Sequence, residues 1–156
     1  MLKTNVCRLL DQAKIPYSCY QYEYDENDLS GISVVNKLNQ DPKCVYKTIV
    51  LVGDKNSYLV CLLPVDKEID LKKLAKLSLN KKVEPLHLAK LEGLTGYLRG
   101  GCSPIGMKKK FPTFANTSLK DIEKVYVSGG LRGLQISLSS QDLIDYCHIK
   151  LGDVIK

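Results

Sequence analysis

The chain has 156 residues, of which 44% are hydrophobic and 26% charged, a composition typical of one globular domain with its own core. No apolar run reaches the roughly 18 to 20 residues that a membrane helix needs, and the amino-terminal residues lead into a patterned segment rather than a signal peptide. We therefore expect a cytoplasmic protein that forms a single domain over residues 1–156.

In the first half of the chain, hydrophobic periodicity predicts alternating helices and strands. The expected elements, in order, are a helix capped by Thr4 and ended by Ile15-Pro16, a strand over 17–24, a helix over 32–38, and a hairpin of two strands over 44–52 and 58–65.

The second half of the chain contains more short strands. The expected elements are a lysine-rich helix capped by Asp70, a helix over 85–91, a short strand at 97–98, strands over 111–115, 124–127 and 134–138, and a helix over 141–147 capped by Ser139 or Ser140. Many short strands among helices, with no internal repeat, predict a mixed α/β fold with a twisted sheet or partial barrel rather than a Rossmann fold.

The cysteines are widely spaced along the chain. All six lie 12 or more residues apart, at Cys7, Cys19, Cys44, Cys61, Cys102 and Cys147. Because there is no CxxC pair and no other cluster of ligands, the spacing favours reduced thiols over disulfides and predicts no metal site.

Positive charge is concentrated in the middle of the chain. Lysine and arginine exceed aspartate and glutamate by 23 to 17, which gives a net charge of +6 and a pI near 8.9. Ten of these cations lie between residues 72 and 110, whereas an acidic stretch over 23–28 lies far upstream. This asymmetry favours a partner with phosphates, and a merely solvated surface is the alternative.

Lys47 is unusual for its strand. Alternation places its side chain on one face with Val45, Ile49 and Leu51. A cation on an apolar face reaches water at the strand edge, pairs with an anion, or contacts a ligand.

Two glycine-rich segments follow predicted strands, over 100–106 and 128–133. Glycines allow main-chain N–H groups to approach a ligand closely, and the adjacent cations Lys108, Lys109 and Lys110 favour phosphate. Ordinary turns are the alternative. If the two loops meet, they form the walls of one pocket.

No nucleophile and base form a recognisable pair in the sequence. There is no GxSxG motif, the imidazoles are His87 and His148, and no carboxylate spacing indicates glycoside chemistry. The residues by themselves therefore predict a site for a polar ligand without naming a reaction.

Three segments together resemble the YbaK family, the free-standing relatives of the prolyl-tRNA synthetase editing domain. They are Val45-Tyr46-Lys47-Thr48, residues 96–109 and residues 126–134, and the likeness covers about residues 3–150. The resemblance implies a YbaK-like fold and an enzyme that deacylates misacylated tRNA, chiefly Cys-tRNA(Pro) and also Cys-tRNA(Cys), without a cofactor. It implies tRNA as a partner and prolyl-tRNA synthetase as a further one.

The resemblance also implies site residues and a mechanism. The functional lysine of the family corresponds to Lys47. The implied substrate-binding residues are Tyr22, Thr48, Gly100, Gly101, Ser103, Ser128, Gly129 and Gly130. The thiol of the substrate cysteine is expected to attack its own ester carbonyl, so Cys102 is not expected to be the nucleophile.

Position 135 departs from the pattern of the family. Cysteine-specific members often have an acidic residue after Arg-Gly-Leu, where this chain has Gln135. Two alternatives therefore remain, an Ala-tRNA(Pro) deacylase and a non-catalytic module that binds tRNA or an aminoacyl-adenylate.

Overall fold

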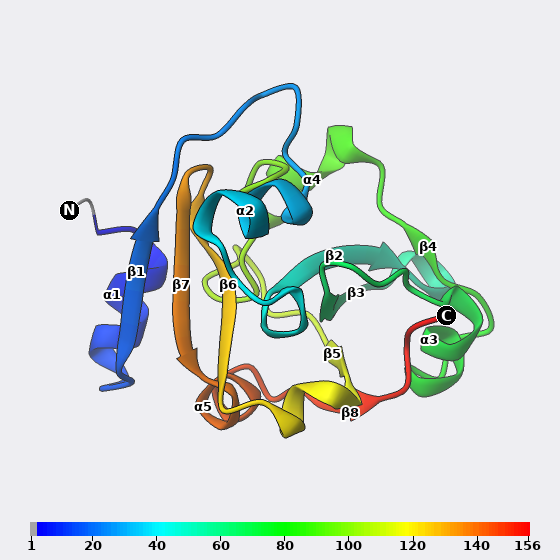
Figure 1. Ribbon diagram of the computed structural model, residues 1–156. Helices are drawn as coiled ribbons and strands as arrows, with labels where there is room; N and C mark the ends of the chain where they lie inside the picture. The colour runs from blue at the N-terminus through cyan, green and yellow to red at the C-terminus, as the bar shows by residue number, and fades with distance from the viewer. Residues whose placement is uncertain (1–2) are drawn as a thin grey trace.

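The computed structural model describes residues 3–156, which form two β-sheets with helices around them (Figure 1). One sheet has the strand order β1-β7-β6 and the other the order β4-β2-β3-β5-β8. The strands are β1 (Tyr17–Gln21), β2 (Tyr46–Val52), β3 (Tyr58–Pro64), β4 (Glu84–Pro85), β5 (Thr113–Asn116), β6 (Lys124–Leu131), β7 (Leu134–Ser139) and β8 (Lys150–Gly152). The prediction of a mixed α/β fold built from short strands is confirmed.

The sheets differ in strand direction and meet at one point. All strand pairs are antiparallel except β3 with β5 and β5 with β8. An isolated parallel bridge joins Tyr126, near the start of β6, to Val45, the residue before β2. The two sheets therefore continue one another at this bridge and separate beyond it.

Side-chain caps begin several of the helices. The α-helices are α1 (Asn5–Gln12), α2 (Gly31–Leu38), α3 (Leu71–Leu77), α4 (Leu91–Thr95) and α5 (Ser140–Tyr146). The side chains of Thr4, Asp70 and Ser139 accept hydrogen bonds from main-chain N–H groups in the first turns of α1, α3 and α5. These three predicted caps are confirmed, and each typically stabilises its helix by about 1 kcal/mol.

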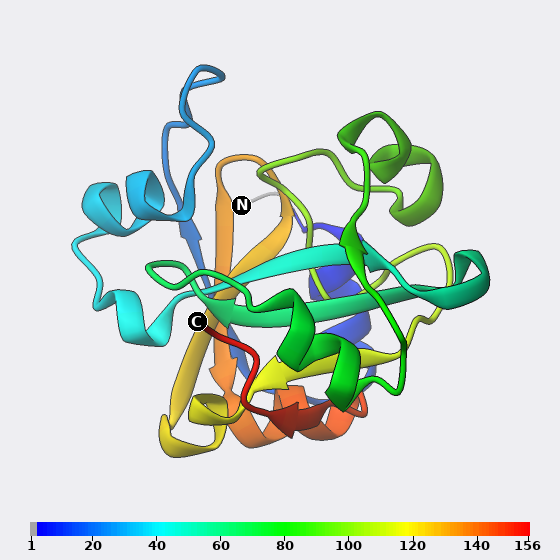
Figure 2. The same cartoon turned by 90° about the vertical axis from the view of Figure 1, so that its right-hand side faces the viewer.

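Strands β2 and β3 separate two hydrophobic clusters. On one face, Tyr46 and Val50 pack in a cluster that includes residues of α1, β6 and β7. On the other face, Leu51 packs with Leu74 and Ala75 of α3. Figure 2 shows α3 in front of this sheet and α1 behind it.

Two predicted elements are wrong. The helix expected over 85–91 begins later, as a 3-10 turn over Leu88–Lys90 that leads into α4. Pro85 instead pairs with Leu51 in the edge strand β4, where a missing N–H is tolerated. The strand expected at 97–98 is a turn, because Gly96 ends α4 in the left-handed region with φ of 86° and the N–H of Tyr97 donates to Thr95 Oγ1.

Three other boundaries differ from the expectation. The first strand ends at Gln21 rather than at residue 24, and β8 follows the last helix where no strand was predicted. The strand expected over 124–127 continues to Leu131 through a bulge between Ser128 and Leu131. The second glycine-rich segment is thus part of a strand and not only a loop.

Within residues 3–156, no helix is both long and apolar enough to cross a membrane. The same residues contain no group of three His, Cys, Asp or Glu side chains placed to hold a metal ion.

Candidate active site

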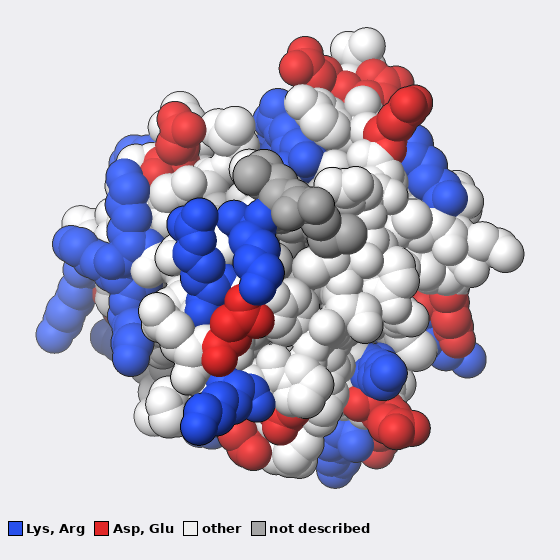
Figure 3. All heavy atoms as spheres, turned by 90° about the vertical axis from the view of Figure 1, so that its left-hand side faces the viewer, with Lys and Arg blue, Asp and Glu red and all other residues white. Residues whose placement is uncertain are grey.

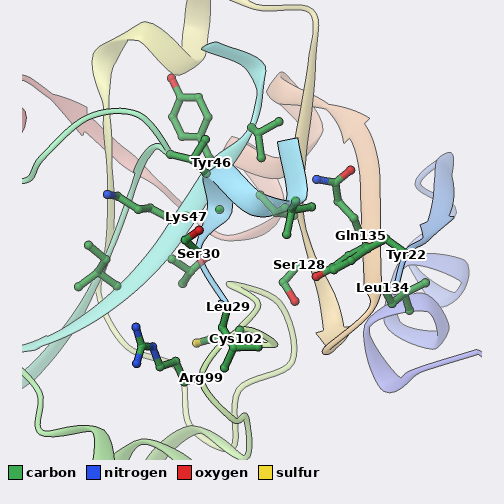
Figure 4. Close-up of a pocket in the computed structure, with 18 residues that line it drawn as sticks. Tyr22, Leu29, Ser30, Tyr46, Lys47, Arg99, Cys102, Ser128, Leu134 and Gln135 are labelled. Atoms are coloured by element: carbon green, nitrogen blue, oxygen red, sulfur yellow. The ribbon is translucent and has the colours of Figure 1, made fainter. Parts of the chain in front are cut away.

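A cavity of about 440 Å³ lies where β2 and β6 diverge beyond the bridge between Val45 and Tyr126 (Figure 4). The amino-terminal end of α2 and the loop over 99–102 complete its wall. The lining residues are Tyr22, Leu29, Ser30, Gly31, Val34, Val45, Tyr46, Lys47, Thr48, Ile49, Val65, Arg99, Gly100, Cys102, Val127, Ser128, Leu134 and Gln135.

The open edge of β2 presents main-chain groups to this cavity. The carbonyl of Val45 accepts from Val65 N next to β3, whereas the carbonyl of Val50 accepts from Leu86 N on the other edge. Because main-chain groups alternate between the two edges of an antiparallel strand, the N–H and C=O of Thr48 point away from β3. Thr48 Oγ1 is buried and has no hydrogen-bond partner within residues 3–156. Thr48 therefore turns its N–H and C=O toward the cavity and holds a buried, unpaired hydroxyl beside them.

Lys47 lies on the face that its strand pattern predicts. Its neighbours Ile49 and Leu51 pack in the cluster beneath α3. The Lys47 ammonium makes no ion pair and no hydrogen bond in the described part of the chain, and burial lowers its pKa despite the charges of Glu68 and Asp66. In Figure 4, Lys47 and Arg99 lie on one side of the cavity, opposite Tyr22 and Gln135.

The two glycine-rich segments meet, as the pocket hypothesis requires. A Cβ atom on Gly101 would lie 3.0 Å from Arg132 N, so the loop and the β6–β7 hairpin approach closely only because residue 101 has no side chain. Arg132 Nε donates to Arg99 O at 2.7 Å. These contacts place Gly100 and Ser128 on the walls of one cavity.

Four of the residues implied as substrate-binding do not line the cavity and make structural contacts instead. Ser103 is fully buried, and its Oγ accepts from Ile105 N at 3.2 Å. A Cβ atom on Gly129 would lie 2.8 Å from Leu134 Cγ. Gly130 has φ of 96° in the bulge of β6. Gly101 allows its loop to pack closely against the main chain of the β6–β7 hairpin. These residues shape the walls behind the lining.

The predicted phosphate contacts also lie outside the cavity. Lys108, Lys109 and Lys110 are absent from its lining, and Lys108 Nζ lies 3.4 Å from Gly93 O. The structure therefore separates these cations from Lys47 and Arg99.

Arg99 and the start of α2 are cavity residues that the sequence reasoning missed. Arg99 contributed only to the count of charges, although its position directly before Gly100 is a usable signal. Ser30 caps α2 by accepting from Ser33 N, and a Cβ atom on Gly31 would overlap the side chain of Val65. No local pattern shows that α2 reaches β2, because this packing joins distant segments.

Gln135 lies in the cavity wall with 3% of its surface exposed and is paired with Gln40. Gln40 Nε2 donates to Gln135 Oε1 at 2.5 Å, and Gln135 Nε2 donates to Gln40 Oε1 at 3.1 Å. No acidic side chain is present among the described residues that line the cavity. The cavity thus holds two cations and no carboxylate.

Two further groups in the wall are uncharged at neutral pH. Burial raises the pKa of the Cys102 thiol to about 12, which leaves it protonated and poorly nucleophilic. Burial also raises the pKa of Tyr22. The arrangement can bind and orient a polar ligand, but its lining offers no activated nucleophile.

Residues 28–146 match the family described as the aminoacyl-tRNA editing domain. A protein of Enterococcus faecalis (strain ATCC 700802 / V583), described as a candidate Cys-tRNA(Pro)/Cys-tRNA(Cys) deacylase, EbsC, is 44% identical over 152 residues. The alignment covers 97% of this chain and 93% of that protein.

Two crystal structures share the fold at 17% sequence identity. The hypothetical protein APE2540 gives a TM-score of 0.89 over 98% of this chain and 100% of that chain. A candidate trans-editing enzyme for prolyl-tRNA synthetase gives a TM-score of 0.82 over 100% of this chain and 99% of that chain. At this identity the likeness concerns the fold alone. From the match over residues 28–146 and the close relative, the chain belongs to the aminoacyl-tRNA editing domain family, and the prediction of an aminoacyl-tRNA deacylase is confirmed.

Proposed function

We propose that this chain hydrolyses Cys-tRNA(Pro) and Cys-tRNA(Cys) in the cavity between β2 and β6, and that residues 1–156 act as one editing domain. The observation that carries the chemistry is a cavity with unpaired polar groups at Lys47 and Thr48 but no activated nucleophile in its lining. Such a site suits a substrate that supplies its own nucleophile.

The proposed reaction uses the thiol of the substrate cysteine. Its sulfur attacks the ester carbonyl carbon, the bond from that carbon to the ribose oxygen breaks, and the ribose hydroxyl leaves with the thiol proton. Water then opens the resulting four-membered thiolactone to free cysteine. The protein contributes orientation and stabilises negative charge on the carbonyl oxygen, which are effects worth several kcal/mol in enzymes.

Within this reaction, the two sides of the cavity have different roles. The cations Lys47 and Arg99 suit the terminal phosphate and the developing charge on oxygen. The main-chain N–H of Thr48 faces the cavity, and its buried hydroxyl, which has no partner within residues 3–156, would donate to the aminoacyl group. Across the cavity, Tyr22, which directly follows β1, and Ser128 of β6 would hold the amino acid side chain.

We place the tRNA backbone on the face that carries α1 and β1, where Figure 3 shows several Lys and Arg side chains gathered together. Lys3 and Arg8 line a hollow of about 240 Å³ on α1. The loop that precedes Lys108-Lys109-Lys110 packs on the same helix, since a Cβ atom on Gly106 would lie 3.1 Å from Leu9 Cδ1. Binding through phosphates predicts an affinity that falls steeply as salt rises.

The test is release of labelled cysteine from Cys-tRNA(Pro) by the unmodified chain and by Lys47→Ala, with the exposed Lys43→Ala as the matched control. We expect the Lys47 variant to lose at least about tenfold in rate and the control to be unchanged. Equal rates for both variants, or no release by the unmodified chain, would instead favour the non-catalytic binding module. Ser-tRNA(Pro) tests the role of the substrate thiol, because serine has a poorly nucleophilic hydroxyl in its place. Fast hydrolysis of this substrate would indicate an enzyme-activated water.

Ala-tRNA(Pro) is the second candidate substrate, because the amide of Gln135 stands where a carboxylate would attract the substrate ammonium. A panel of Cys-, Ala- and Ser-charged tRNAs decides between these substrates. Adding prolyl-tRNA synthetase to the same assay tests whether a synthetase partner supplies the choice of tRNA.

A further inference from the structure

Cys7 and Cys19 lie in contact at the junction of α1 and β1, and the proposed reaction uses neither of them. Their Sγ atoms are 3.9 Å apart. Cys7 belongs to α1 and is 1% exposed, whereas Cys19 belongs to β1 and is only partly buried. Figure 1 shows the two elements side by side at the amino-terminal edge of the molecule.

We propose that Cys7 and Cys19 form a reversible disulfide that fastens α1 to β1, and that this pair is a modification site separate from the cavity. A disulfide has an S–S distance of about 2.05 Å, so the two sulfurs must approach each other by about 1.9 Å. Cys44, Cys61, Cys102 and Cys147 have no thiol in contact within residues 3–156, which makes this pair distinct among the six.

The polar neighbours of the pair suit thiol chemistry. Thr4 Oγ1 lies 3.5 Å from Cys7 Sγ, and Thr4 also caps the helix through Cys7 N. Although burial raises the pKa of Cys7, hydrogen bonds from Thr4 and contacts with Cys19 and Tyr17 outweigh it and lower the pKa overall. The ion pair of Lys3 with Asp11, at 2.7 Å, lies beside the same junction.

The oxidant is a small disulfide such as oxidised glutathione. Burial raises the pKa of Cys19, the more exposed partner, to about 11, so only a small fraction of it is thiolate at neutral pH and the first step is faster in alkaline buffer. That thiolate attacks one sulfur of the small disulfide, forms a mixed disulfide and releases the first small thiol. The thiolate of Cys7 then attacks Cys19 Sγ and releases the second. The two cysteine protons end on the two released thiols, and excess thiol reverses both steps.

The bond would also rigidify part of the cavity wall, because α1 supports the bulge of β6. Thr4 Oγ1 donates to Gly129 O at 2.7 Å, and Val6 Cγ2 lies 3.0 Å from the Cβ position of Gly130. Ser128, which lines the cavity, is the first residue of this bulge. A fixed α1 therefore restrains the wall at Ser128.

The test incubates the full chain with oxidised glutathione and measures intact mass and disulfide-linked peptides. We expect the loss of two hydrogens and a peptide linking Cys7 with Cys19 in the unmodified chain and in the control Cys44→Ser. We expect a persistent glutathione adduct or no reaction in Cys19→Ser and Cys7→Ser. A stable adduct on the unmodified chain without the link, or a link between other cysteines, would overturn the proposal.

Two further measurements test the consequence. The oxidised chain is expected to unfold at a temperature higher by about 5 to 10 °C, because the cross-link closes a loop of about a dozen residues. Amide hydrogen exchange over residues 128–131 should slow on oxidation and recover with thiol. Unchanged exchange in a fully cross-linked chain would refute the coupling to the cavity. Because the Cys19 side chain is partly exposed, Cys19→Ser is expected to fold even if Cys7→Ser does not, and this variant alone is then sufficient for the test.

Discussion

The side-chain amides of Gln40 and Gln135 donate to each other across the wall of the cavity, at 2.5 and 3.1 Å. Gln40 follows the left-handed residue Asn39 that ends α2, and Gln135 lies in β7. The pair therefore connects the end of α2 to the sheet behind the cavity. It also occupies both the Oε1 and the Nε2 of Gln135 in hydrogen bonds.

Replacing Gln40 by Ala should leave a buried amide unpaired. We expect Gln40→Ala to lower the free energy of unfolding by about 1 to 3 kcal/mol, measured by urea denaturation. Gln141→Ala on the exposed surface of α5 is the control and should change stability by less than about 0.5 kcal/mol. Equal midpoints for both variants would show that water replaces the Gln40 amide.

Replacing Gln135 by Glu should change the choice of amino acid. The new carboxylate would still accept from Gln40 Nε2 and would attract the substrate ammonium. We expect kcat/KM for Cys-tRNA(Pro) to rise by about tenfold or less, at a cost in stability of about 1 to 3 kcal/mol for the buried charge. A fall in kcat/KM in a folded variant would show that the neutral wall is required.

Thr48→Val should separate stability from activity, because it keeps the shape of the side chain and removes a buried, unpaired hydroxyl. We expect unfolding to need about 1 kcal/mol more, while deacylation falls about tenfold. Ser140→Ala removes the other unpaired buried hydroxyl, which lies away from the cavity. This control should gain similar stability with an unchanged rate, and a matching loss of rate would contradict a role for Thr48.

The lowered pKa of Lys47 predicts a pH-dependent effect of its removal. Folding lowers the pKa of Lys47 below its ordinary value of 10.5. At a pH between the folded and the unfolded pKa, the unfolded chain therefore binds more protons than the folded protein. The buried charge of Lys47 thus lowers the free energy of unfolding by its full amount at a pH below the folded pKa. This cost disappears as the pH rises through the ordinary pKa of 10.5. Lys47→Met should raise the urea midpoint at pH 7 and raise it less near pH 10, whereas exposed Lys43→Met should do neither.

Gly101→Ala should disturb the contact between the loop and the hairpin. Its Cβ atom would lie 3.0 Å from Arg132 N and 3.1 Å from Leu131 C, which are main-chain atoms that cannot rotate away. We expect a loss of about 1 to 3 kcal/mol in unfolding free energy and slower deacylation. Gly93→Ala in α4 has no atom within 4 Å of its Cβ and should be neutral or slightly stabilising. Equal effects at the two positions would contradict the close-contact argument.

Much of the local structure was predictable because its causes are local. Thr4, Asp70 and Ser139 cap helices with their own side chains, and alternation correctly placed Lys47 with Ile49 and Leu51. The predictions were wrong where pairing with a strand distant in the sequence overrode the local pattern. Pro85 joins a strand because Leu51 lies beside it. The glycines at 129 and 130 stay in β6 because β7 pairs with Ser128 and Leu131 on either side of them.

The sequence by itself determined the class of the fold, the caps and, through its motifs, the family and its deacylase activity. These depend on side chains near one another along the chain or on segments that can be matched one by one. Only the tertiary structure decided which residues share the cavity. Lys47, Arg99 and Gln135 line one cavity because β2 and β6 separate after a single bridge, whereas Ser103 and Gly129 make packing contacts behind its wall. The divergence of β2 and β6 depends on how the two sheets twist relative to each other, which cannot be predicted from any single segment of the sequence.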